Sequence, residues 1–490
     1  SVHRRLHWDR PNQTHPSSAS ASREGAETML TGAQYLESLR DDRRVFLDGV
    51  LVDDVTADPG IGPATAIVAA GYDRFYDPSP AACHPCFSIP RSVDELRDRA
   101  EVLVSTDVTA SLSAVAMALL TAAPALAEAQ PAYADRIRAY FADCVARDVR
   151  FAEVITDAKG DRTLPPSRQE DPDLYLRIVD RDTDGIVITG AKFHITAAPV
   201  VHELVVMPTK RMKPGEDEYA VACAVPADAP GVTMIAASHH PRGGDWRSHP
   251  VSERLAIPDA TVIFDHVRVP WDRVFLAGEV EHSAAVAHAL GLWERLSGCA
   301  HLAHLGDLLA GIAQLIAEAN GTERIPHIKD KIADIVLYAT LTRAGLEAAV
   351  ANCEANRDGL LFPNELYTNA AKLYAATNYS VMVRHLHDIA GGTVATAPTI
   401  ADLENPDLRP YIEKYLRGAA GISGEYRLRL FHLIRNLTAD EWGGREAVSW
   451  LQSGGGLFAQ RTVLRNRFDM AAAKRLALDF GGLTDKAPQA

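Results

Sequence analysis

A polar, turn-rich segment in the middle of the chain carries side chains that could bind a charged or polar ligand. Residues 156–163 read Thr-Asp-Ala-Lys-Gly-Asp-Arg-Thr, and residues 189–192 read Thr-Gly-Ala-Lys. The backbone N–H groups of such a turn, with hydroxyl, carboxylate and cationic side chains, can surround a polyanion or a polar ring. An ordinary surface loop is the alternative interpretation, because clusters of polar residues also mark loops that bind nothing.

The residues that follow this segment predict a β-hairpin that would hold it in place. Leu174–Val179 and Ile186–Thr189 are runs of strand-forming residues, and Asp184-Gly185 between them favours a tight turn. We therefore expect the polar segment to be a loop at the edge of a β-structure.

Three zones of composition divide the chain. Residues 29–150 are mostly helical in pattern after a short hairpin at Val45–Val52, turned by Asp48-Gly49. Residues 151–280 carry β-branched runs separated by Pro, Gly and Asp, and residues 281–490 carry long helical patterns interrupted by prolines. This order predicts an α+β protein with an N-terminal helical domain, a compact middle β-domain and a C-terminal helical bundle.

The N-terminal 28 residues contain charges, His, Ser and Pro but no apolar core stretch, so residues 1–28 are predicted to be a tail or extension rather than a signal peptide. Thr31 and Gln34 then have the spacing of a capping box for the first helix. The most apolar run, Ala114–Ala127, is too short for a bilayer and predicts a buried helix.

Composition excludes several classes of protein. The 490 residues are 47% apolar and 23% charged, as in ordinary soluble proteins, and the net charge of −14 argues against nucleic acid as a partner. Six dispersed cysteines are no disulfide framework for a chain of this size. A reducing cytoplasm is the predicted location.

Four sequence blocks, taken in order, carry a family resemblance. They are residues 156–192, Phe264–Leu276, Asp388–Gly392 and Ser453–Arg461. Their order resembles the flavoprotein family of 4-hydroxyphenylacetate 3-hydroxylase and 4-hydroxybutyryl-CoA dehydratase, which has the acyl-CoA dehydrogenase-like fold. The resemblance implies a middle β-barrel domain, FAD held between that domain and the C-terminal bundle, and a homotetramer whose neighbouring subunits complete the site.

Carried over by position, the resemblance assigns a set of cofactor-binding residues. Glycines in the set would let backbone approach the cofactor, since they lack the Cβ that would block it. The set that would bind FAD is Thr156, Asp157, Lys159, Arg162, Thr196, Gly391, Ser453, Gly454, Gly455, Gly456 and Gln460.

The dehydratase branch of the family also binds an iron–sulfur cluster through three cysteines and a histidine. Leu112 and Ala116 stand where two of those cysteines should be, and Leu292 stands at the histidine position. Cys299 remains, but a single thiolate cannot hold a cubane cluster. The resemblance therefore predicts FAD without an iron–sulfur cluster and argues against dehydration that depends on a cluster.

No metal site is predicted elsewhere. The close spacing of Cys83 and Cys86 suggests a zinc site, but zinc needs four ligands and no second close pair of ligands follows in the sequence. Glu279 and His282 have the spacing of half a di-iron site without the other half, and His301 and His304 are more typical of a packed pair on one helix face.

The hydroxylase branch places a histidine before the flavin loop and an arginine and tyrosine on the N-terminal helix, where they hold a phenolate. Here Glu153 stands at that histidine position, and residues 109–120 offer only Thr, Ser and apolar groups. Glu153 could act as a general base or pair with a cationic or N–H-bearing substrate. A surface carboxylate is the alternative interpretation.

Two further residues are candidates for placing the substrate. Arg168 lies in the loop that follows the polar segment, and His194 precedes Thr196 by two positions. In a regular strand, residues at i and i+2 face the same side, so His194 would point where Thr196 points. A satisfied core histidine is the alternative for His194.

These residues predict a flavin monooxygenase that receives FADH2 from a separate reductase and hydroxylates a small aromatic or heteroaromatic substrate with O2. The chain shows no Gly-x-Gly-x-x-Gly after an early strand, hence no nicotinamide domain of its own. A redox-neutral acyl-CoA isomerase or dehydratase-like enzyme without a cluster is one alternative. A non-catalytic flavin-binding assembly subunit is another.

Overall fold

The computed structural model describes residues 29–105, 107–241, 243 and 245–483, so the predicted tail at residues 1–28 lies outside the described part. The first part of the chain is mainly helical, as predicted. Its helices are α1 (Gly32–Ser38), α2 (Gly62–Phe75), α3 (Val93–Ser105), α4 (Val108–Ser111), α5 (Ala114–Ala129) and α6 (Pro131–Arg147), and its strands are β1 (Val45–Leu47) and β2 (Val50–Val52).

Local sequence signals account for the start of this part. The Thr31 side chain accepts a hydrogen bond from the backbone N–H of Gln34, and the Gln34 side chain accepts one from the backbone N–H of Thr31. The predicted capping box therefore begins α1. The hairpin expected at Val45–Val52 is confirmed, with both turn residues, Asp48 and Gly49, at positive φ. β1 also pairs in parallel with β8, so this hairpin is a part of the middle sheet although it lies in the helical zone of the sequence.

The middle of the chain forms two sheets. Its elements are β3 (Phe151–Val154), β4 (Arg177–Arg181), β5 (Gly185–Thr196), β6 (Glu203–Val206), β7 (Val221–Pro226), β8 (Val232–Ala237), α7 (Ser252–Leu255), β9 (Asp259–Pro270) and β10 (Val274–Ala277). One sheet has the order β2-β1-β8-β9-β5-β4 and the other the order β10-β7-β6-β3. The predicted hairpin around Asp184-Gly185 is the antiparallel pair β4–β5.

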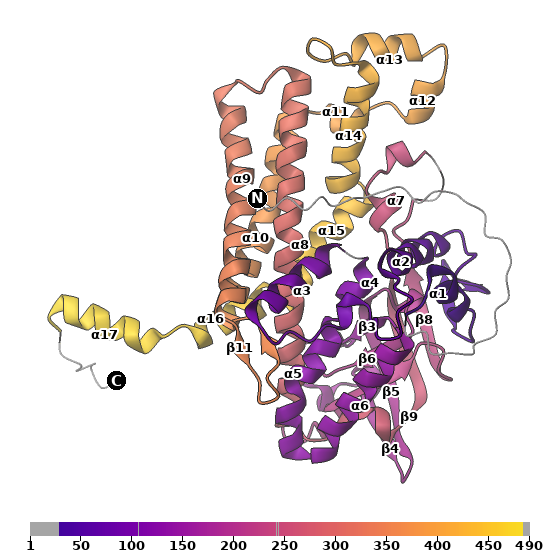
Figure 1. The fold of residues 1–490 in the computed structure, drawn as a ribbon, viewed down its shortest axis with the longest axis vertical. Coiled ribbons are helices and arrows are strands. Elements are labelled where there is room, and N and C mark those ends of the chain that lie inside the picture. The colour runs from indigo at the N-terminus through magenta and orange to yellow at the C-terminus, as the bar shows by residue number, and fades with distance from the viewer. Residues whose placement is uncertain (1–28, 106, 242, 244, 484–490) are drawn as a thin grey trace.

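The last part of the chain is helical, as expected. Its elements are α8 (Ser283–Asn320), α9 (Pro326–Ala351), β11 (Glu354–Ala355), β12 (Leu361–Phe362), α10 (Glu365–Ala390), α11 (Thr393–Thr396), α12 (Ile400–Glu404), α13 (Arg409–Tyr415), α14 (Gly424–Thr438), α15 (Glu441–Gln452), α16 (Gly456–Arg467) and α17 (Met470–Gly481). The long helices α8, α9 and α10 lie side by side, and α17 extends away from the body (Figure 1).

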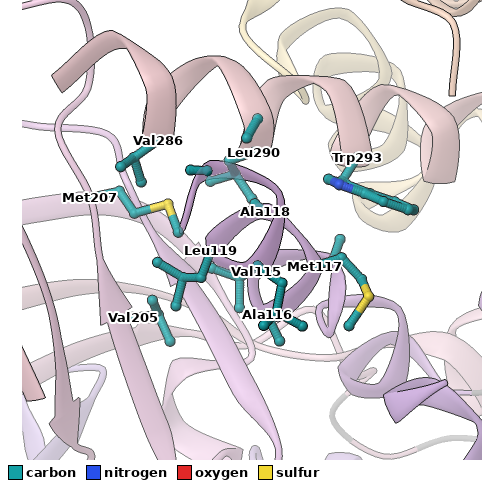
Figure 2. Packing of buried hydrophobic residues seen from close by; sticks show 14 of the residues in the cluster. Val115, Ala116, Met117, Ala118, Leu119, Val205, Met207, Val286, Leu290 and Trp293 are labelled. Atoms are coloured by element: carbon teal, nitrogen blue, oxygen red, sulfur yellow. The ribbon is translucent and has the colours of Figure 1, made fainter. Parts of the chain in front are cut away.

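Helix α5 fills the junction between the β-structure and the bundle. Val115 and Leu119 of α5, Val205 of β6 and Leu290 of α8 are all buried in one apolar cluster (Figure 2). Two stretches, Val108–Ala129 and Val280–Asn320, are long and apolar enough to cross a membrane, but 72% and 50% of their apolar windows are buried inside the protein. Burial of that kind is typical of core helices.

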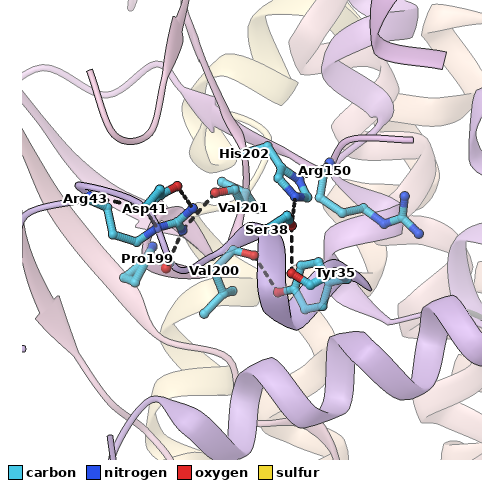
Figure 3. Close-up of polar contacts among 9 residues, drawn as sticks. All are labelled: Tyr35, Ser38, Asp41, Arg43, Arg150, Pro199, Val200, Val201 and His202. Carbon is cyan, nitrogen blue, oxygen red and sulfur yellow. Dashed lines mark hydrogen bonds and ion pairs between the residues drawn. The ribbon is translucent and has the colours of Figure 1, made fainter. Parts of the chain in front are cut away.

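Polar contacts attach the N-terminal segment to the β-structure (Figure 3). The Arg43 guanidinium donates to the carbonyl oxygens of Pro199 and Val201 at 2.9 and 3.0 Å. The Tyr35 hydroxyl donates to the carbonyl oxygen of Val200 at 2.7 Å. These buried bonds satisfy backbone carbonyls that would otherwise be left without a partner.

Candidate functional site

A cleft of about 3350 Å³ lies where the β-structure meets the helical bundle. Helices α4, α8, α15 and α16 contribute to its walls, together with the loop after β3 and the end of β5. Most of the residues predicted for the site line it: Glu153, Thr156, Lys159, Arg162, His194, Thr196, Ser453, Gly454, Gly455 and Gly456.

The other predicted residues lie outside the lining of this cleft. Asp157 is buried, forms an ion pair with Lys192 at 2.8 Å and accepts the backbone N–H of Leu176 at 2.9 Å. Its carboxylate is thereby committed to the β-structure. Arg168 is exposed on a short 3₁₀ turn, and Gly391 ends helix α10.

Gln460, also predicted for the cofactor, is fully buried on α16 rather than in the lining of the cleft. Neither Nε2 nor Oε1 of its amide has a hydrogen-bond partner among the described residues. Buried amides of this kind usually bond to a group outside the chain or to water.

His194 and Thr196 both line the cleft, but regular alternation is not the reason. The register between β5 and β9 shifts between Lys192 and Ile195, and His194 has a φ of +62°. A β-bulge inserts an extra residue and redirects the side chains of the bulged strand. The bulge exposes the histidine side chain and brings the end of β5 to the cleft.

Thr196 is part of a polar network that joins β5, β9 and α15. Its hydroxyl donates to Oδ1 of Asp259 at 2.6 Å, and the Arg445 guanidinium donates to both oxygens of the same carboxylate at 3.0 and 3.1 Å. Burial alone would raise the pKa of Asp259, but the hydrogen bond from His239 and the charge of Arg445 lower it to about 2. The Thr196 hydroxyl proton is therefore held by a carboxylate, and its oxygen is left to accept.

Sequence reasoning missed this network. Asp259 and Arg445 are separated by 186 residues, and neither stands in a motif. Glu446, beside Arg445, is also in the lining, and burial raises the pKa of its carboxyl although Arg445 opposes the shift. No local signal marks these residues, because only the packing of α15 against the β-structure brings them together.

The glycine run predicted to approach a cofactor has the required backbone. Gly454, Gly455 and Gly456 have φ values of +70°, +91° and +60°. A Cβ on Gly454 would lie 2.9 Å from Cγ of Arg295, and the Arg295 Nε donates to the Gly454 carbonyl oxygen at 2.7 Å. Beside this run the Ser453 hydroxyl is buried with no partner among the described residues.

Four cations gather on the β-structure side of the cleft: Lys159, Arg162, Lys210 and Arg211. None of them forms an ion pair with another described residue. Burial lowers the pKa of Lys159, and the charge of Arg162 lowers it further. Unpaired cations that repel one another can bind a phosphate or pyrophosphate group through charge-assisted hydrogen bonds.

Two carboxyls meet on opposite walls of the same cleft. Glu153 lies on β3 and Glu294 on α8, and each is partly buried. Burial raises the pKa of Glu153 well above its usual range, and the charge and hydrogen bond of Glu294 raise it further. Glu153 is thus a carboxyl of the cleft and not the surface carboxylate considered as its alternative.

Metal ligands are not gathered in the described part of the chain, where no group of three His, Cys, Asp or Glu side chains is placed to hold an ion. Leu112, Ala116 and Leu292 are buried apolar residues. The Cys299 thiol contacts the carbonyl oxygen of Thr368 at 3.6 Å. The absence of an iron–sulfur cluster stays a prediction.

Comparison with known proteins places the chain in a family. The family described as 4-hydroxyphenylacetate 3-hydroxylase matches over residues 31–276 with its N-terminal part and over residues 283–482 with its C-terminal part. The oxygenase component of 4-hydroxyphenylacetate 3-monooxygenase from Thermus thermophilus is 29% identical over 449 residues, which cover 85% of this chain and 90% of that protein.

A second relative is named as a dehydratase and isomerase rather than a monooxygenase. The 4-hydroxybutyryl-CoA dehydratase/vinylacetyl-CoA-Delta-isomerase of Clostridium aminobutyricum is 28% identical over 496 residues, covering 93% of this chain and all of that protein (100%). Among solved structures, the oxygenase component of 4-hydroxyphenylacetate 3-monooxygenase complexed with FAD matches with a TM-score of 0.85 and 28% identity, over 92% of this chain and 98% of that one.

These matches span both halves of the chain and confirm the predicted family, an enzyme family whose relatives include flavin-binding monooxygenases. The chain belongs to the 4-hydroxyphenylacetate 3-hydroxylase family.

Proposed function

We propose that this chain is the oxygenase component of a two-component flavin monooxygenase. A separate reductase supplies reduced FAD, and the chain hydroxylates a small aromatic or heteroaromatic compound with O2. The single observation that carries the proposal is the cleft, whose lining contains both a positive-φ glycine run and a group of cations without ion pairs among the described residues. The FAD complex of the related oxygenase component supports the choice of cofactor.

The residues of the cleft fit FAD. Gly454–Gly456 offer backbone without Cβ atoms, and the buried Ser453 hydroxyl lacks a partner that a polar cofactor would supply. Lys159 and Arg162 have the charge and donors for the pyrophosphate. We assign Thr156, Thr196 and Ser453–Gly456 to the flavin end of the cofactor.

When bound, reduced FAD supplies the activation of O2. The chain contributes placement and a dry environment. Asp259 holds the Thr196 hydroxyl so that its oxygen accepts, while Leu112 and Leu290 give the cleft apolar walls that exclude water. Burial and the neighbouring Glu294 raise the pKa of Glu153 well above its usual range, which favours its protonated form, and this carboxyl can exchange a proton with a substrate group.

His194 and Arg168 are the two other residues proposed to place the substrate, and only one of them lines the cleft. The exposed His194 side chain lines the cleft and can contact a substrate directly. Arg168 lies outside the lining, so a substrate role for it requires a neighbouring subunit or movement of its loop. Gly391 and Gln460 also lie outside the lining of the cleft. A cofactor role for these two residues requires that part of FAD extends beyond the cleft of one subunit.

The second candidate function is redox-neutral flavin chemistry on an acyl-CoA. The similarity to the dehydratase/isomerase relative favours it, and the apolar side chains of Leu112, Ala116 and Leu292 argue against its cluster-dependent form. Turnover of a CoA ester without O2 would support this candidate. Iron and acid-labile sulfide should be absent from protein purified without oxygen, and a stoichiometric amount of both would overturn the cluster-free assignment.

We further propose a cytoplasmic homotetramer with three structural units, divided near residues 150 and 280. Leu337 and Leu341 on α9 are half exposed, at 51% and 45%. Helix α17, which extends away from the body in Figure 1, has no buried residue in the single chain. Apolar surface of this extent is typical of an interface between subunits. Light scattering should give four times the mass of one chain, and a monomer would contradict the proposal.

The decisive experiment incubates the purified protein with FAD, NADH, a flavin reductase and ¹⁸O2, and follows candidate phenols and N-heterocycles by mass. One ¹⁸O atom in the product supports the monooxygenase. Tight binding of FAD without turnover of any compound, with or without O2, would favour the non-catalytic assembly subunit instead.

A further inference from the structure

The carboxyl pair Glu153 and Glu294 has a chemical consequence for the substrate. Two carboxyl groups hydrogen-bond each other only when one of them holds a proton, since two carboxylates repel. The Oε1 atom of Glu153 is nevertheless buried and has no partner among the described residues. The pair therefore offers an unused acceptor and a proton that a cation could replace.

The cations near the pair are already bonded elsewhere. Arg295, Lys372 and His301 lie near enough to Glu294 for its charge to act on each of them. Arg295 donates to the carbonyl oxygen of Gly454 at 2.7 Å, and the Lys372 ammonium donates to the carbonyl oxygen of Trp450 at 2.8 Å. Each of these cations makes its printed hydrogen bond to backbone and not to the carboxyl pair, and Oε1 of Glu153 keeps no partner among the described residues.

An aromatic wall lies beside the pair. The Trp450 indole and the His301 ring both line the cleft, with centroids 6.2 Å apart. Nδ1 of His301 is 2.9 Å from the carbonyl oxygen of Ser297 and must donate to it. Nε2 of the neutral ring is then an acceptor. Carboxylates, an accepting imidazole and an indole face together match the recognition of a cationic nitrogen.

We propose that Glu153 and Glu294 form the subsite for a cationic nitrogen, so that the preferred substrate is an aromatic or heteroaromatic compound carrying an amine or amidine. This inference rests on the function proposed above and specifies its substrate class. Binding replaces the shared proton with one positive charge, so the net charge of the subsite is unchanged while the proton passes to solvent. The buried Trp450 Nε1–H, which has no partner among the described residues, can donate to an oxygen of the same ligand.

The test compares three ligands that share a 4-hydroxyphenyl ring and differ in charge: tyramine, tyrosol and 4-hydroxyphenylacetate. Binding to protein loaded with oxidised FAD is measured by calorimetry and by the flavin absorbance, without reductase. Tyramine should bind at least about tenfold more tightly than tyrosol, as expected for hydrogen bonds between charged groups, and 4-hydroxyphenylacetate should bind most weakly. Equal affinity for tyramine and tyrosol would overturn the proposal.

Isosteric variants locate the effect. Glu153→Gln and Glu294→Gln should each remove most of the preference for tyramine. The matched control is Asp307→Asn, a cleft carboxylate on the same helix as Glu294 and about 20 Å further along it, which should keep the preference. Retained preference in both glutamine variants would refute the assignment, and the wild-type ligand series decides the question even if a variant fails to fold.

Proton release separates a binding role from a merely structural one. Calorimetry of tyramine binding in two buffers of different ionisation enthalpy should show proton release by the wild type and none by Glu153→Gln. No release by the wild type would contradict the shared-proton subsite. Because the reductase and O2 are absent, failure of oxygenation counts against the proposed function alone, whereas loss of the amine preference with oxygenation intact counts against this inference alone.

Discussion

Replacing Lys192 with Met should destabilise the β-structure strongly, because Lys192 balances a buried carboxylate. Its ammonium forms an ion pair with Asp157 at 2.8 Å and donates to the carbonyl oxygens of Ile155 and Met207 at 2.9 and 3.0 Å. Both charged side chains are only 2% exposed. Methionine fills a similar volume, so the change removes mainly the charge and the three contacts.

The expected loss follows from leaving a buried charge without its partner, which costs about 3–5 kcal/mol. For a cooperative folding unit of about 150–250 residues, this loss lowers the midpoint temperature of unfolding by roughly 6–20 °C. Burial already raises the pKa of Asp157 although Lys192 opposes the shift, and without the lysine the folded-state pKa rises further. When a carboxyl has a higher pKa in the folded state than in the unfolded state, the free energy of unfolding falls as the pH rises above the pKa of the unfolded state. Lys192→Met should therefore lose more stability at pH 8 than at pH 5.

Thermal unfolding followed by circular dichroism at pH 5 and pH 8 measures both effects. The double variant Lys192→Met with Asp157→Leu should regain part of the loss, since no uncompensated carboxylate remains. The matched control is Arg343→Met, which breaks an exposed pair with Asp307 and should cost no more than about 1 kcal/mol. If Lys192→Met costs as little as this control, the assignment of Asp157 to the β-structure rather than to a ligand is refuted.

Three further changes test the cleft. Gly454→Ala places a Cβ 2.9 Å from the Arg295 side chain at a φ of +70°, so flavin fluorescence titration should show FAD affinity about tenfold lower or worse. The control Gly311→Ala changes an exposed glycine of α8 outside the cleft lining, whose added Cβ meets no other part of the protein within 4 Å, and should bind FAD normally. Thr196→Trp should fill the ring face of the site and abolish FAD retention on a desalting column; unchanged affinity would remove Thr196 from the site. Asp259→Asn should cost roughly 2 kcal/mol at neutral pH, because the pKa of Asp259 is lowered to about 2 in the folded state. That cost should shrink as pH falls from about 4 towards 2, and unfolding curves showing a constant cost would contradict it.

The sequence alone determined the local features, because each depends on a few adjacent residues. The turn at Asp48-Gly49, the β4–β5 hairpin and the capping box of Thr31 were all predicted and are all present. Backbone preferences of Asp and Gly in tight turns act over two residues, and a cap acts over four. The glycine run at Gly454–Gly456 was predictable for the same reason, since positive φ is a local property.

The tertiary structure decided which of the predicted polar residues face the cleft. Asp157 was expected at the cofactor, but Lys192 lies opposite it on β5 and holds it in the β-structure. The bulge before Ile195 sets the exposure of His194, which regular alternation cannot describe.

Only packing across the chain formed the charged groups at the centre of the site. Glu153 of β3 and Glu294 of α8 meet in the lining of one cleft, and Asp259 meets Arg445 across 186 residues. Such pairs leave no pattern in a single sequence, because their energy comes from burial and opposing charge at a junction that exists only in the folded chain.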